Sequence, residues 1–307
     1  MSDAPSTLHA AATVLDEASA AAVAALSPRS RDTLNTVLTH ASLRRFEPDP
    51  LPGDVVAALE AALVRGPTSS ALHSYTHVLV RDVQSKRELA RLAGDQPWIA
   101  AAPLLIVGCA DLRRAREVTH GQGYRYTAHD LRMLISATAD LTIGLQNASL
   151  VAQSLGYGTV LIGGVLDGSL EIAQRLGLPR RVVPLIGLSI GRPAVGRLPP
   201  PRPRLPLRLL VHHERWSLDA ATEEALLTEH DRATRARGDF EGRRIRWLEV
   251  GRGERDPVPV GEYGWREHTA RKQGRDSWGP QGAKVDHDLA AQELRVSSTG
   301  EVDEPLG

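Results

Sequence analysis

The sequence predicts a mixed fold of helices and short strands. Its 307 residues are enough for one large domain or two ordinary ones, and 42% of them are hydrophobic, so a core can be buried. Two short runs at 76–82 and 103–111 are rich in β-branched residues and have the length of core strands. A much longer pattern with helical period covers residues 130–156.

Other elements alternate along the first two thirds of the chain. Leu34, Val37 and Leu38 recur at helical spacing and predict a first core helix over residues 33–43. Asp54 is expected to cap the helix that follows. The same signals predict further helices at 54–65, 85–92 and 169–179, and further strands at 159–164 and 183–191.

The long helix over residues 130–156 has apolar side chains around most of its circumference. A helix that is apolar nearly all round has to be buried on every side. We therefore expect it either in the centre of the core or at an interface between subunits.

The two ends of the chain differ in composition from the middle. Residues 1–30 read as a helical extension, and a proline-rich linker at 192–206 precedes a region rich in Arg, Glu, Asp and Gly. A solvated helix is expected at 218–237 and disorder from about residue 286. The expected organisation is an extension (1–30), a core (31–216), a C-terminal excursion (217–285) and a disordered tail (286–307).

Bulk properties argue against several classes of protein. Acidic and basic residues balance at 37 each, which disfavours a nucleic-acid binder. The only cysteine, Cys109, allows no intrachain disulfide and fits a reducing, cytoplasmic setting. No apolar run reaches the ~20 residues that span a membrane, and the N-terminus lacks the basic region of a signal peptide. His212 and His213 would point to opposite faces of a strand, so we expect no metal site there.

Four separate segments carry groups suited to one ligand. Each has an ordinary interpretation: a cationic helix end, a Ser/Thr loop, a glycine turn, and a basic linker stiffened by proline. Each could also supply cations, hydroxyls or bare backbone to a bound molecule. The segments are "THASLRRF" (39–46), "GPTSSALHS" (66–74), "SLGYGTVLIGG" (154–164) and "RPRLP" (202–206).

The order and spacing of these segments, together with "GDQPWIAAAPLLIVGCAD" and "LGLPRRVVPLIGLSIGRP", resemble the nitroreductase family. The similarity is to its oxygen-insensitive NADPH nitroreductases and NADPH–flavin oxidoreductases, and it covers residues 33–216 well. It implies an α+β fold that binds FMN, with a central, mostly antiparallel sheet flanked by helices. It also implies a homodimer with the long helix buried at the dimer interface.

The resemblance assigns the phosphate end of FMN to two motifs. His40, Ser42 and Arg44 match the family's H-R-S-x-R motif, in which the first arginine is replaced here by Ala41. The family's K-P-R-L-P motif is RPRLP here. It supplies the further phosphate-binding cations Arg202 and Arg204.

The resemblance assigns the flavin ring to three other segments, and the phosphate of NADPH to the excursion. The ring-binding residues would be Thr68, Ser69, Ser70, Gln96, Ile162, Gly163 and Gly164. Arg243 or Arg244 would bind the phosphate of NADPH. His73 stands where the family usually has glutamine, and its role is left open.

The activity implied is electron transfer from NADPH, with NADH possible, through FMN to nitroaromatic, quinone or flavin acceptors. Kinetics would be ping-pong, and no protein side chain would be a catalytic residue because the flavin carries the chemistry. Two alternatives stay open. One is a flavin-binding module without robust turnover, and the other is a dedicated flavin enzyme of a biosynthetic pathway.

Overall fold

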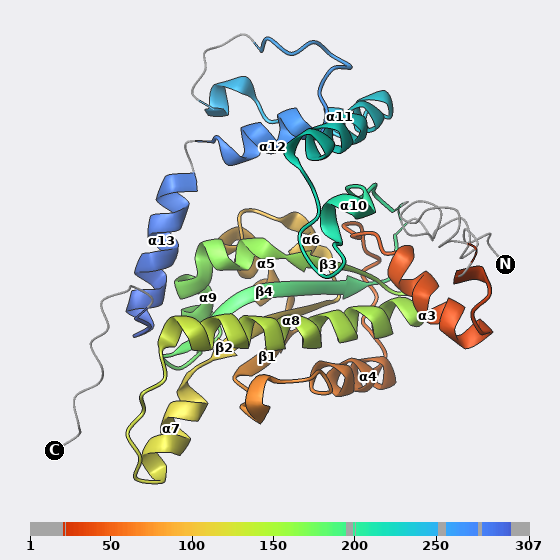
Figure 1. Ribbon diagram of the computed structural model, residues 1–307. Coiled ribbons are helices and arrows are strands. Elements are labelled where there is room, and N and C mark those ends of the chain that lie inside the picture. Colours follow the sequence, from red (N-terminus) through yellow and green to blue (C-terminus); the bar gives the residue numbers. More distant parts are fainter. Residues whose placement is uncertain are drawn as a thin grey trace. The chain divides into compact units, whose positions relative to one another are not determined.

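The structure, a computed structural model, describes residues 21–295 except 22, 195–198, 200, 251–255 and 276–277. The chain divides into two compact units, which are described separately below (Figure 1). The core unit comprises residues 40–200 and 283–307, and the excursion unit comprises residues 1–39 and 201–282.

A four-stranded sheet forms the centre of the core unit. Its spatial order is β1 (Tyr75–Val80), β2 (Leu104–Asp111), β4 (Val182–Gly191) and β3 (Gly158–Ile162). Every neighbouring pair is antiparallel, and a register shift lies between Gly108 and Cys109. The predicted strands are confirmed, and β1 and β3 form the two opposite edges of the sheet.

Helices cover both faces of this sheet. On one face lie α4 (Gly53–Leu63) and α8 (Asp130–Ser154), and on the other lie α5 (Val83–Leu92), α6 (Pro97–Ala101) and α9 (Ser169–Arg175) (Figure 1). Each layer of helices packs its own cluster of buried apolar side chains against the sheet. The α+β architecture expected from the sequence is therefore confirmed.

The long helix α8 is buried in its central part. Leu141, Leu145 and Ala148 are completely inaccessible, as the apolar pattern predicts. Nearer the N-terminal end, Leu131 and Ile135 are 40% and 64% exposed. The core unit therefore leaves an apolar surface at that end of α8 uncovered.

Three further elements belong to residues 40–200 of the core unit. They are the 3₁₀ turn η1 (Ser69–Ala71), the helix α7 (Arg113–Gly121) and the 3₁₀ helix η2 (Gly163–Gly168). The turn η1 lies between α4 and β1, and η2 follows directly on β3.

The expected first core helix over residues 33–43 is wrong at both ends. Helix α3 runs from Pro28 to Leu38, with Ser27 as the N-cap that accepts a hydrogen bond from the backbone of Ser30. Proline at the first helical position and a serine cap are strong start signals, and they override the apolar spacing. Helix α3 buries none of its residues, and it belongs to the excursion unit.

The C-terminal region is also more ordered than expected. Helix α13 spans Trp278–Ala291, and Leu289 and Leu294 are buried in the core cluster that contains α8. The backbone N–H of Arg295 donates to Asp130 Oδ2 at 3.0 Å. The predicted disorder is therefore wrong for residues 286–295. Residues 296–307, and most of the expected extension at 1–30, lie outside the described residues.

The excursion unit is helical where it is described. Its elements after the linker are α10 (Leu207–Leu210), α11 (Ala220–Ala236), η3 (Glu241–Arg243), η4 (Trp247–Val250) and α12 (Trp265–Gln273). The expected solvated helix at 218–237 corresponds to α11, in which only His230, Asp231 and Thr234 are buried.

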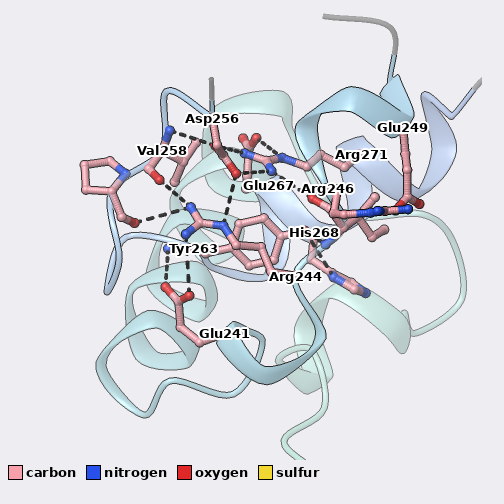
Figure 2. A network of polar contacts seen from close by, with 12 residues as sticks. Glu241, Arg244, Arg246, Glu249, Asp256, Val258, Tyr263, Glu267, His268 and Arg271 are labelled. Carbon is pink, nitrogen blue, oxygen red and sulfur yellow. Dashed lines mark hydrogen bonds and ion pairs between the residues drawn. The ribbon is translucent and has the colours of Figure 1, made fainter. Parts of the chain in front are cut away.

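A polar cluster takes the place of an apolar core in part of this unit (Figure 2). The guanidinium of Arg271, only 2% exposed, donates to both carboxylate oxygens of Asp256 at 2.7 Å and to Glu267 at 2.7 Å. Arg244 and Arg271 both stack on the ring of Tyr263, each 4.9 Å from its centroid. The hydrogen bonds from Arg271 hold the pKa of the Asp256 carboxyl well below its usual value.

No helix in the described part of the chain combines the length and apolar composition needed to cross a bilayer.

Candidate functional site

Residues 40–44 form the first part of the candidate site. Ala41 and Leu43 are buried, whereas Arg44 is exposed and His40 and Ser42 are half-buried. This alternation is that of an extended chain, in which every second side chain points the same way. The N–H of Leu43 donates to Thr159 O at 2.9 Å, so the segment lies beside β3. His40, Ser42 and Arg44 thus share the side that faces away from the core.

Two contacts orient the cationic side chains of this segment. The guanidinium of Arg44 lies over the ring of Trp98 in α6, 5.3 Å from the ring centroid. His40 Nδ1 lies 3.0 Å from Gln153 Oε1, while the amide nitrogen of Gln153 donates to the backbone of Ser149. Because the amide oxygen can only accept, Nδ1 of His40 carries the proton, and its Nε2 is left for another partner.

The glycine turn after β3 forms the second part. A Cβ on Gly164 would lie 2.4 Å from Ala93 O and 2.5 Å from Gln96 Nε2, so only glycine fits there. A Cβ on Gly163 would meet nothing within 4 Å. The amide nitrogen of Gln96 donates to Ala93 O at 2.6 Å, which holds this side chain against the turn. Ile162, one residue earlier, is 1% exposed.

We call these two parts together the β3 cluster. Its members are His40, Ser42, Arg44, Gln96, Gly163 and Gly164. An imidazole, a hydroxyl and a guanidinium on one side of an extended segment suit a phosphate group. Open space beside bare backbone at Gly163 suits a flat ring. The donor set therefore fits FMN, which combines a phosphate tail with a planar ring system.

The Ser/Thr loop at 68–70 is held by α8 instead. Thr68 Oγ1 donates to Asp140 Oδ2 at 2.6 Å, and the N–H of Ser69 donates to the same carboxylate at 3.1 Å. Asp140 is only 5% exposed. The loop continues through Ser70, which has the left-handed φ of 50°, and leads into β1.

The loop and the β3 cluster lie at opposite edges of the sheet. Thr68 and Ser69 bind Asp140 of α8, which covers one face, and the loop leads into the edge strand β1. Gln96 caps α6 on the other face, and Gly163 follows the opposite edge strand β3. Within one chain the structure brings the members of the β3 cluster together, and it does not bring the loop to them.

The four remaining predicted arginines belong to the excursion unit. Arg202 and Arg204 are exposed, and Arg204 Nη1 donates to the carbonyl of Arg202 at 3.2 Å. Arg244 is engaged by Asp256 at 3.2 Å, by the Tyr263 ring and by the carbonyl of Val258. Arg243 is exposed, with its guanidinium 5.3 Å from the centroid of the Phe240 ring.

The adjacent histidines and the single cysteine of the sequence were also considered as site residues. The imidazole of His212 packs on Trp216, with 4.3 Å between ring centroids. No group of three or more His, Cys, Asp or Glu side chains among the described residues could hold a metal ion. Cys109 is fully buried in β2, and burial raises the pKa of its thiol to about 12.

Sequence reasoning missed Trp98, Gln153 and Asp140. Trp98 and Gln153 lie inside ordinary helical patterns, where nothing marks them as neighbours of His40 and Arg44. Asp140 did carry a signal, because an acidic residue in the middle of a strongly apolar helix needs a buried partner.

The fold and the β3 cluster define an α+β protein with a candidate site for a flat ligand that carries an anionic tail. The sequence pattern of the nitroreductase family matches residues 37–192, just over half of the chain. The chain belongs to this family.

Curated relatives agree with this assignment. The chain is 31% identical over 190 residues to an FMN reductase (NADPH) of Bacillus subtilis, a match that covers 61% of this chain and 76% of the relative. It is 30% identical over 185 residues to an NADPH-flavin oxidoreductase of Vibrio harveyi, covering 60% of this chain and 75% of the relative. Among solved structures, the NfrA1 nitroreductase of B. subtilis superposes with a TM-score of 0.73 at 25% identity, covering 85% of this chain and 98% of that one.

Proposed function

We propose that the chain reduces small-molecule acceptors (nitroaromatics, quinones or flavins) with electrons that FMN takes from NADPH or NADH in a ping-pong sequence. As a member of the nitroreductase family it is an NAD(P)H-dependent flavin oxidoreductase that uses FMN. The flavin supplies the hydride and electron transfer, and the protein binds and orients it. The single cysteine fits a cytoplasmic setting.

One observation supports this proposal most directly. The alternating burial of residues 40–44 places His40, Ser42 and Arg44 on the side of a segment beside β3 that faces away from the core. In the proposal these three side chains hold the phosphate and the ribityl chain, and Arg202 and Arg204 add further positive charge. Gln96 and the backbone of Gly163 and Gly164 face the ring.

The ring-binding loop comes from a second copy of the chain in this proposal. The loop at 68–70 leads into the edge strand β1, and the β3 cluster lies at the opposite edge of the same sheet, so in this proposal a single chain does not present both to one ring. A homodimer in which each chain lends its loop to the other would complete two equal sites. The exposed Leu131 and Ile135 of α8 offer apolar surface for such an interface.

Arg243 is our choice between the two candidates for the phosphate of NADPH. Arg244 already makes an ion pair with Asp256 and stacks on Tyr263, and releasing it would disrupt the polar cluster. Arg243 lies next to it with a more exposed side chain, and its guanidinium donates to the backbone carbonyl of Asp239 at 3.1 Å and lies over the ring of Phe240.

The test compares two neighbouring arginines. In Arg44→Ala we expect the Kd for FMN to rise about 10- to 150-fold, since a charged hydrogen bond contributes roughly 1.5–3 kcal/mol. Arg45→Ala removes an equally exposed cation outside the β3 cluster and should bind FMN like the wild type. Titration by quenching of FMN fluorescence measures both variants.

Turnover distinguishes the enzyme from its first alternative. NADPH oxidation by the FMN-loaded protein should accelerate when a quinone or a nitroaromatic is added. A protein that binds FMN without such stimulation would be a flavin-binding module. The presence of Ala41 in place of a family arginine favours this alternative. A protein that takes up no FMN would refute the proposed function. A panel of acceptors would reveal a dedicated substrate.

A further inference from the structure

Asp140 is a buried carboxylate with an unusual set of partners. It lies in the middle of α8, 5% exposed, and it accepts hydrogen bonds from Thr68 Oγ1 at 2.6 Å and from the N–H of Ser69 at 3.1 Å. All these donors belong to the loop that precedes β1. The carboxylate therefore holds the loop rather than its own helix.

The loop it holds is strained. Ser70, Ala71 and His73 have φ angles of 50°, 53° and 49°, in the left-handed region that residues with a Cβ avoid. Such conformations cost free energy, and they persist only where surrounding contacts enforce them. Three of them within four residues mark this loop as a segment with a required shape.

Hydrogen bonds fix the loop at both ends. Thr68 Oγ1 accepts from the N–H of His73 at 3.1 Å while it donates to Asp140, so the hydroxyl links the end of the loop to α8. At the far side, Arg114 donates to the carbonyl of His73 and forms an ion pair with Asp111 at 2.9 Å.

The backbone that leads into the loop is pressed against the same helix. A Cβ on Gly144, one turn after Asp140, would lie 2.5 Å from Leu63 O. A Cβ on Gly66 would lie 2.8 Å from the Ile143 side chain. Helix α8 and the start of the loop are therefore in direct contact, and Asp140 acts from a rigid base.

Burial of side chains does not offset the free energy of this strain, because residues 69–73 are all exposed. A buried acid here holds three strained residues in a surface loop that presents hydroxyl and backbone groups outward. We infer that Asp140 is a positioning residue of the flavin site, which fixes Thr68–His73 in the shape that binds the FMN ring. This inference rests on the proposed function.

Asparagine at position 140 keeps the size of the side chain but removes its negative charge and one of its two acceptor oxygens. With the amide oxygen in the Oδ2 position, the NH₂ group would take the place of Oδ1 and face the N–H of Ser69, which is also a donor. Thr68→Val is a second, milder variant, because it removes the hydroxyl that links His73 to Asp140 and keeps the volume. Thr142→Val is the matched control, since its hydroxyl donates to Thr138 O of the same helix at 2.7 Å.

The experiment measures three properties of each purified protein. These are the Kd for FMN, the visible circular dichroism of bound FMN, and the Tm of the apoprotein. We expect Asp140→Asn to raise the Kd about tenfold or more and to change the dichroism, with a smaller change of the same kind in Thr68→Val. The apoprotein Tm of both should stay close to that of Thr142→Val.

Three results would overturn the inference. The first is a Kd and a dichroism like the wild type in both variants, and the second is an equal rise of the Kd in Thr142→Val. The third is an Asp140→Asn protein that does not fold, together with a Thr68→Val protein that binds FMN like the wild type. A wild-type protein that binds no FMN would instead refute the proposed function.

Discussion

Gly163 and Gly164 are neighbours in the chain, yet they differ in their tolerance for a side chain. At Gly164 a Cβ would collide with backbone oxygen of Ala93, whereas at Gly163 it would project into open space. Neither glycine has a positive φ, so the contrast is one of space alone. Gly164 is required by close packing, and Gly163 leaves room for a ligand.

We therefore expect opposite effects from two substitutions. Gly164→Ala should lower the free energy of unfolding by about 1–3 kcal/mol, as overpacked sites do. Gly163→Leu should unfold like the wild type but lose FMN binding, because the side chain would fill the space of the ring. Urea unfolding and FMN titration of both proteins test the pair. Wild-type FMN affinity in Gly163→Leu would show that the ring does not lie there.

His77 in β1 contributes a pH dependence to stability. Both ring nitrogens are buried and have no hydrogen-bond partner in the described structure, and burial lowers the pKa of the imidazole to about 4. The unfolded chain, with a histidine pKa of 6.5, binds this proton more readily. The stabilisation is therefore complete above pH 6.5 and is lost as the pH falls from there toward 4.

His77→Leu should remove this dependence. Relative to the variant, the wild type should lose on the order of 3 kcal/mol of unfolding free energy between neutral pH and pH 4. Urea titrations at a series of pH values measure the difference. His213→Gln, at an exposed position, is the control and should follow the wild-type profile. Parallel profiles for the wild type and His77→Leu would contradict the assignment.

At the scale of elements, Arg271 is a buried side chain that attaches helix α12 to the rest of the excursion unit. Arg271 connects it to Asp256 by two hydrogen bonds and to the backbone carbonyl of Ile245, and it stacks on Tyr263 (Figure 2). A guanidinium satisfies this geometry because it is planar and forked, and a lysine ammonium does not.

Arg271→Lys should therefore destabilise the excursion unit although the charge is kept. We expect a loss of about 3 kcal/mol, the lower end for breaking a buried ion pair. Limited proteolysis should then cut within residues 237–275 faster than in the wild type. Arg246→Lys is the control, because that side chain is 81% exposed. Equal cleavage rates in both variants would mean that Arg271 does not hold this unit.

Sequence patterns predicted the strands and the long helix of the core unit, and α11 in the excursion unit, but not the polar cluster of the excursion unit. The strands and α8 are built from apolar side chains, whose spacing reveals the element. In the excursion unit, the residues that pack are Arg271 and Asp256, which look like solvated surface in a sequence. The segment at 286–295 was mispredicted for a related reason, since two leucines, Leu289 and Leu294, anchor an otherwise polar stretch.

The candidate site was predictable in part. His40, Ser42 and Arg44 were assigned through the resemblance to the family, because the apolar spacing had placed His40 and Ser42 inside a helix that ends at Leu38. The contact of Gln96 with Gly164 joins segments far apart in the chain, and only the resemblance to a family brought them together in advance. The partner of Thr68 and Ser69, Asp140, lies some 70 residues away, and no local pattern connects them.

At the scale of the whole molecule, the proposed exchange of loops between two chains can be tested by mixing defects. Gly163→Leu blocks the β3 cluster and Ser69→Trp, at an exposed position, blocks the loop. If each site combines parts of two chains, a dimer with one defect per chain has one intact site and one doubly blocked site.

Mixed dimers, purified by two different tags, should bind about half as much FMN as wild-type dimers. Each homodimeric variant should bind none at the same concentration. If the loop and the β3 cluster of one chain served the same ring, the mixed dimer would bind none either. A wild-type protein that sediments as a monomer would refute the exchange altogether.

Cys109 has a consequence for handling quinones. Quinones arylate thiolates, and the one thiol of this chain is buried inside the sheet, where burial raises its pKa to about 12. Under the proposed function, the polypeptide would turn over such electrophiles without arylating a cysteine of its own. For the same reason, a cysteine introduced on its surface would be the sole attachment point for a maleimide dye or an electrode linker, with no native thiol to remove first.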